Sequence, residues 1–162
     1  MHKRRKESQK DEKRMVLLRN FKKEDALELQ EHGHSNLTTE QTEALIYDWN
    51  QKQFNGKYFE MYAIVADEKI VGTISLYQHS SEVVSIGPAV FCEYRRKGFA
   101  KEAMIRACQI AREKGFKIVS QQIRTNNTAS IALHRSLGFE TSEHVFTNAK
   151  GNQVSIYLKS LF

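Results

Sequence analysis

The segment Arg95-Arg96-Lys97-Gly98-Phe99-Ala100 combines a glycine with several cations at the start of an expected helix. An apolar run, 83–92, precedes it, and a helical pattern, 100–114, follows it. The first amides of a helix have no intrahelical partner and carry a partial positive charge, and a glycine lets a ligand approach the backbone closely. Lys101 adds a fourth cation to the three in the segment. These residues predict a site for a phosphate or pyrophosphate group.

The spacing Arg-x-x-Gly-x-Ala differs from the Walker motif and from the dinucleotide motif Gly-x-Gly-x-x-Gly. Taken alone, it also fits an ordinary helix start with solvated charges. A second stretch, 127–139, reads Asn-Thr-Ala-Ser-Ile-Ala-Leu-His-Arg-Ser-Leu-Gly-Phe and lies one expected helix and one expected strand later. The order and spacing of the two stretches are more specific than either one.

Together, the two stretches resemble the motifs of the GNAT family of N-acetyltransferases, Arg/Gln-x-x-Gly-x-Gly/Ala and Asn-x-x-Ala/Ser before a helix that ends in Gly-Phe. The resemblance covers the chain from Met15 to its end. It implies direct transfer of an acetyl group from acetyl-coenzyme A to an amine, without a metal. In this family the pantetheine arm lies where the strand before the glycine turn splays from its neighbour. Coenzyme binding is thereby assigned to Val90, Arg95, Arg96, Lys97, Gly98, Phe99, Ala100, Lys101, Asn127 and Ser130.

His134 stands where most family members carry a tyrosine that protonates the departing thiolate. Since histidine titrates near neutrality, we predict that it is the general acid. The alternative is a solvent-facing helical histidine. The residues around His134 are similar to those of the amino-acid and phosphinothricin acetyltransferase branch. This similarity favours a small amino-acid-like acceptor, and a protein N-terminus is the other candidate acceptor. The general base is not identified, although Glu60, Glu82 and Glu93 flank the central strands.

The elements that must position these residues follow from periodicity. A first strand is predicted at 15–19, helices near 23–29 and 39–49, and a hairpin of strands 59–66 and 70–77. Pro88 interrupts the next strand, which indicates an edge strand, a bulge or a lost pairing. The helix from Ala100 places small apolar residues on one face, which predicts close packing on the sheet. In the final strand, Val154, Ile156 and Leu158 are expected to point inward.

The composition of the chain excludes several classes of protein. The chain has 162 residues, 40% of them hydrophobic, with no apolar run long enough for a membrane span and no secretory signal. Residues 1–14 hold seven Lys/Arg and three Asp/Glu, so this segment accounts for +4 of the net charge of +6. It is interpreted as a basic N-terminal extension, either simply solvated or binding nucleic acid, and Met15 is a candidate natural start.

We therefore predict one α/β domain at 15–162, with a mixed, mainly antiparallel sheet of about six or seven strands and about four helices on its faces. Cys92 and Cys108 have no metal-ligand spacing and are expected to be free thiols in the cytoplasm. Two other functions stay open: a catalytically silent acetyl-coenzyme A-binding module and a nucleic-acid-binding protein that acts through its basic segment. A homodimer also stays open.

Overall fold

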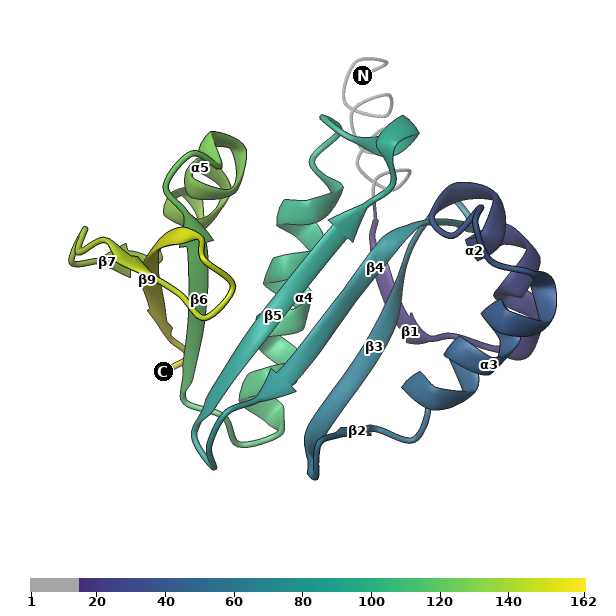
Figure 1. Cartoon of the computed structure of the whole chain (residues 1–162), viewed down its shortest axis with the longest axis horizontal. Coiled ribbons are helices and arrows are strands. Elements are labelled where there is room, and N and C mark those ends of the chain that lie inside the picture. The colour runs from purple at the N-terminus through teal and green to yellow at the C-terminus, as the bar shows by residue number, and fades with distance from the viewer. Residues whose placement is uncertain (1–14) are drawn as a thin grey trace, which may run out of the picture.

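A computed structural model describes residues 15–162, so the expected basic extension at 1–14 lies outside the described residues. Single 3₁₀ turns precede α2 and follow β5. Among the described residues, no helix is long and apolar enough to cross a membrane. In chain order (Figure 1), the helices and strands are β1 (Leu17–Asn20), α2 (Ala26–His32), α3 (Thr39–Trp49), β2 (Gln53–Phe54), β3 (Lys57–Ala66), β4 (Lys69–Gln78), β5 (Val83–Val90), α4 (Phe99–Glu113), β6 (Ile118–Arg124), α5 (Thr128–Ser136), β7 (Glu140–Thr141), β8 (Phe146–Thr147) and β9 (Gln153–Ser160).

The sheet has the strand order β1-β3-β4-β5-β6-β9-β7, with β2 paired to β3 and β8 paired to β9. Every pairing is antiparallel except that of β5 with β6. The predicted hairpin of β3 and β4 is confirmed: Asp67 and Glu68 turn with φ of 49° and 63°, the left-handed conformation that tight hairpins favour. The predicted mixed, mainly antiparallel sheet with helices on its faces is therefore observed.

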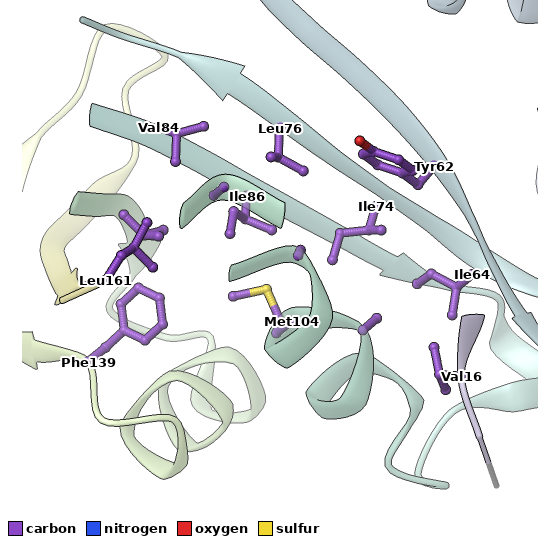
Figure 2. Packing of buried hydrophobic residues seen from close by; sticks show 14 of the residues in the cluster. Val16, Tyr62, Ile64, Ile74, Leu76, Val84, Ile86, Met104, Phe139 and Leu161 are labelled. Carbon is purple, nitrogen blue, oxygen red and sulfur yellow. The ribbon is translucent and has the colours of Figure 1, made fainter. Parts of the chain in front are cut away.

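Helix α4 packs on one face of the sheet, and α2 and α3 cover part of the other (Figure 1). Under α4, Met104 meets strand residues such as Ile74 and Leu76, all with no exposed surface (Figure 2). Most of the predicted apolar face of α4 is also buried: Ala103, Ala107 and Ala111 have no exposed surface, whereas Ala100 and Cys108 are partly exposed. The small buried side chains let the helix axis approach the strands closely. A second cluster, including Leu29 and Ile46, lies under α2 and α3.

The prediction for the last strand is wrong for two of its three residues, because only Val154 is buried. Ile156 and Leu158 are 41% and 46% exposed, whereas Ser155 and Tyr157 are buried. The helices cover only one face of β9, and the Tyr157 ring packs there in the main core with a ring centroid 6.5 Å from that of His134. Before β9, residues 142–145 separate the two short strands β7 and β8.

Candidate active site

Strands β5 and β6 form a fork. On its other side β5 pairs with β4 over its length, from Val84 to Val90, but its parallel ladder with β6 holds only two residue pairs. These pairs join Val83 to Ile118 and Val84 to Val119. Beyond them the two strands diverge toward the end of the sheet where α4 and α5 begin (Figure 1). Beyond Val84, the edge of β5 that faces β6 therefore has no ladder partner, although β5 lies inside the sheet.

The backbone direction along β5 shows which groups face the fork. The Ile86 amide donates toward β6, and because both backbone groups of a strand residue point the same way and alternate along the chain, Pro88 and Val90 face β6 too. Pro88 lies opposite Ile74 on β4. Because its nitrogen faces β6, the missing N–H costs no bond of the ladder with β4. The edge-strand interpretation of Pro88 is wrong, and the lost pairing lies on the β6 side. The Val90 amide faces the open part of the fork.

Gln121 of β6 fills the fork next to its closed end. Its side-chain Oε1 accepts from the Ile86 amide at 3.0 Å, and its Nε2 donates to the Ile86 carbonyl. One buried side chain thereby replaces the ladder for one residue of β5. Sequence reasoning missed this residue, although a glutamine between the buried Val119 and Ile123 was a signal.

His134 lies on α5 beside Gln121. The helix is capped by Asn127, whose side chain accepts from the Ser130 amide at 3.1 Å. His134 is only 3% exposed, so the solvent-facing alternative is wrong. Its Nδ1 lies 2.7 Å from the Ser130 carbonyl and donates to it, while Nε2 lies 3.3 Å from Nε2 of Gln121 and accepts from that amide. Burial lowers the pKa of His134, against the opposing effect of the Ser130 carbonyl, so the ring is neutral at pH 7.

The glycine turn has the backbone that a bound anion requires. Gly98 has φ of 84° and Arg96 has φ of 61°, and a Cβ placed on Gly98 would meet no atom of the described chain within 4 Å. Gly98 begins α4 without a side-chain cap, and the first helical bond to it comes from the Glu102 amide. The amides of residues 99–101 are therefore free of helical partners. Arg95 is tied to the fork because its Nε donates to the Val90 carbonyl at 3.1 Å.

The structure thus brings most predicted coenzyme-binding residues to one end of the sheet. Val90 and residues 95–101 lie on one side of the fork, and α5, which carries Asn127, Ser130 and His134, lies on the other (Figure 1). The arrangement offers a free strand edge between two helix N-termini. It fits a long ligand with an anionic group at one end and an amide-bearing chain.

On the sheet face opposite α4, an aromatic groove runs between α3 and the ends of β3 and β4. Its lining residues are Leu45, Asp48, Trp49, Gln53, Phe54, Phe59 and Tyr77. Of the three carboxylates that flank the central strands, Glu82 pairs with Lys117 at 3.0 Å and Glu93 with His32 at 2.6 Å. Glu60 is buried on the α4 face. None of the three lines the groove.

A family model described as an acetyltransferase (GNAT) domain matches residues 15–140. The chain therefore belongs to the GNAT family of acetyltransferases, and the sequence resemblance is confirmed.

Several known proteins are similar to the chain, including two curated relatives and one solved structure. The SPbeta prophage-derived uncharacterized N-acetyltransferase YokL of Bacillus subtilis (strain 168) is 33% identical over 95 residues, 57% of this chain and 54% of that protein. This match spans about half of YokL. The ribosomal protein bS18-alanine N-acetyltransferase of Salmonella typhimurium (strain LT2) is 23% identical over 118 residues, 69% of this chain and 80% of the relative. The crystal structure of the microcin C7 self-immunity acetyltransferase MccE, in complex with acetyl-CoA and AMP, superposes with a TM-score of 0.74 at 19% identity, covering 90% of this chain and 92% of that one.

Proposed function

We propose that the protein is an N-acetyltransferase that moves the acetyl group of acetyl-coenzyme A directly to an amine. The observation that carries the proposal is the fork between β5 and β6, which opens directly beside the Gly98 turn. A pyrophosphate fits the free amides and cations of that turn, and the amide-bearing arm of the coenzyme fits the free edge of β5. The solved relative that holds acetyl-coenzyme A supports the same donor.

Each predicted residue has a role in this proposal. Arg95, Arg96, Lys97 and Lys101 supply positive charge around the backbone amides of residues 98–100. The Val90 amide, which faces the fork beside the glycine turn, is a candidate hydrogen-bond donor to the amide-bearing arm of the coenzyme. Asn127 and Ser130 bound the other side of the fork and contact the arm of the coenzyme.

His134 remains our candidate for the acid that protonates the departing thiolate, and the structure adds a requirement. In the resting tautomer, the one ring proton is on Nδ1 and is held by the Ser130 carbonyl. His134 must therefore first gain a proton on Nε2, where Gln121 now donates. An imidazolium there would repel the Gln121 amide, so Gln121 must rotate for the acid to form.

The acceptor is proposed to be a primary amine, either a small amino-acid-like molecule or a protein N-terminus. The bS18-alanine N-acetyltransferase supports a protein acceptor, since its name states an alanine of a ribosomal protein. The groove beside α3 is a surface for the group that carries the amine. The free thiols Cys92 and Cys108 support a reducing compartment, and we propose the cytoplasm.

The first experiment measures thermal stability with and without acetyl-coenzyme A. At a hundred times its Kd, a ligand that binds only the folded state stabilises it by about 2.7 kcal/mol, which is a rise in Tm of about 5–10 °C for a chain of this size. Gly98→Glu places a carboxylate in the proposed pyrophosphate site and should abolish the rise. Gly151→Glu is the matched control, because Gly151 has φ of 82° and equally open surroundings in the β8–β9 turn.

A panel of amines, followed by thiol release and mass spectrometry, then separates the functions. Acetylation of at least one amine supports the transferase. A coenzyme-dependent rise in Tm without any transfer would support the silent module instead. Binding of nucleic acid that weakens steeply with salt, and no response to acetyl-coenzyme A, would support action through the basic segment.

A further inference from the structure

His79 and Ser85 form a hydrogen-bonded pair at the closed end of the fork, on the face opposite α4. The Nε2 of His79 lies 2.6 Å from Oγ of Ser85, and this hydroxyl donates to the Ser120 carbonyl of β6 at 2.6 Å. Ser85 directly follows Val84, the last residue of β5 that pairs with β6. The pair therefore marks the point where the two strands separate.

The hydrogen bonds fix which nitrogen of His79 is basic. Ser85 has one hydroxyl proton, and the Ser120 carbonyl can only accept it. The Nε2 of His79 therefore carries the ring proton and donates to Ser85, which leaves the lone pair on Nδ1. None of the hydrogen bonds among the described residues involves this Nδ1. Ser85 thereby holds the ring in one tautomer with a free acceptor nitrogen.

The charged and titratable neighbours keep this ring neutral. Burial lowers the pKa of His79, and the nearby Lys57 ammonium lowers it further. Lys57 comes from β3, and its Nζ donates to the His79 carbonyl at 3.0 Å. On β4, the Tyr77 ring meets the His79 ring edge-on with centroids 5.2 Å apart. A neutral imidazole at pH 7 can take up a proton.

The aromatic groove leads to this ring. Tyr77 lines the groove and also touches His79, so the two features are continuous. Gly87 follows Ser85 on the same face of β5, is exposed, and leaves the floor beside the pair without a side chain. A group held in the groove can therefore reach the fork next to His79.

We propose that His79 takes a proton from the acceptor amine and that Ser85 is its positioning residue. The assignment rests on the acetyltransferase function proposed above. The acceptor ammonium gives one proton to Nδ1, and the freed nitrogen lone pair forms the C–N bond to the thioester carbon. The C–S bond breaks with its electron pair on sulfur. The nitrogen loses its second proton as the amide forms, and this loss matches the proton that the thiolate gains. The third proton stays on the amide nitrogen. His79 then returns its proton to water.

The kinetic test compares His79→Gln with the wild-type chain on an amine that the panel identifies. We expect kcat/KM to fall by about 10²–10⁴-fold, the usual contribution of a general base. The rise in Tm with acetyl-coenzyme A should be unchanged, because the pyrophosphate turn lies at the other end of β5. His144→Gln, which changes an exposed histidine between β7 and β8, is the control and should keep full activity.

Ser85→Ala tests the positioning role. The wild-type kcat/KM should rise with pH through a pKa below 6.5, and Ser85→Ala should shift this limb while lowering the rate less than His79→Gln does. A second measurement needs no acceptor: ¹⁵N NMR of the full chain, with His79 assigned by its loss in His79→Gln, should show the Nε2–H tautomer and a pKa below 6.5.

Two kinds of result would overturn the assignment. If the wild-type chain transfers acetyl groups but His79→Gln keeps its rate and its acidic limb, or if NMR shows the Nδ1–H tautomer, His79 is not the base and the proposed function stands. If the wild-type chain transfers to no amine, the proposed function fails and the assignment fails with it.

Discussion

Glu60 provides the sharpest test of how the fold is held together, because its carboxylate is buried among donors from four segments. Oε1 accepts from the Tyr58 hydroxyl at 2.6 Å, and Oε2 accepts from Nδ2 of Asn20 at 3.0 Å. The ammonium groups of Lys114 and Lys52 lie 3.5 and 3.8 Å from it. The carboxylate thus ties β1 and β3 to the C-terminal end of α4 and to the segment after α3.

The expected cost of Glu60→Gln follows from the pKa of this carboxyl group. Burial by itself would raise it, but the hydrogen bonds of Tyr58, Tyr62 and Asn20 and the charge of Lys114 lower it from 4.5 to about 2. Each pKa unit corresponds to about 1.4 kcal/mol, so the ionised group stabilises the folded state by about 3 kcal/mol at pH 7. Glutamine keeps the shape but loses the charge and one acceptor. Tm should fall by about 6–12 °C at pH 7.

The pH dependence separates this cause from simple misfit. A lowered folded-state pKa gives stability that is full above pH 4.5 and is lost as pH falls through 2. The gap in free energy of unfolding between wild type and Glu60→Gln should therefore shrink from about 3 kcal/mol at pH 7 to about 2 kcal/mol at pH 3.5. Urea unfolding at both pH values measures it. Glu140→Gln changes an exposed glutamate and should show a gap near zero at each. A gap of the same size at both pH values would refute the electrostatic explanation.

Three further predictions concern other parts of the molecule. His134→Phe should lower kcat by about 10²–10⁴-fold and leave acetyl-coenzyme A affinity nearly unchanged, whereas full kcat in steady-state assays would make His134 a bystander. Gly72→Ala should destabilise the chain by about 1–3 kcal/mol in urea unfolding, since its Cβ would meet the carbonyl of Ala89 on β5; an unchanged midpoint would contradict this. A chain spanning 15–162 should fold and bind acetyl-coenzyme A like the full chain, and a tenfold weaker affinity by calorimetry would show that the first residues contribute to the site.

Local signals in the sequence predicted much of the fold. The glycine turn before α4 and the small apolar residues on one face of that helix each depend on residues a few positions apart, and the structure has both. The order of the two motifs was enough to indicate the family, which the match over residues 15–140 confirms.

The features that the sequence did not predict depend on contacts between distant strands. Gln121 meets Ile86, and His79 meets Ser85 and Ser120, only because the register of β4, β5 and β6 aligns them. The predicted orientation of β9 was wrong for a related reason. Its apolar residues do not tell which face the helices will cover, and that depends on where α5 packs.

The short ladder between β5 and β6 has a mechanical consequence. Strands β1, β3, β4 and β5 form one leaf of the sheet and β6, β9 and β7 form another. Two residue pairs, the Gln121 side chain and the Ser85–Ser120 hydrogen bond join the leaves at one end. A force that pulls the leaves apart would peel these bonds one after another instead of shearing them together. The ladder should therefore yield at low load, and the core residues that pack together from both leaves supply the remaining resistance. A molecule bound between the two leaves would contact both of them and raise the force needed to separate them.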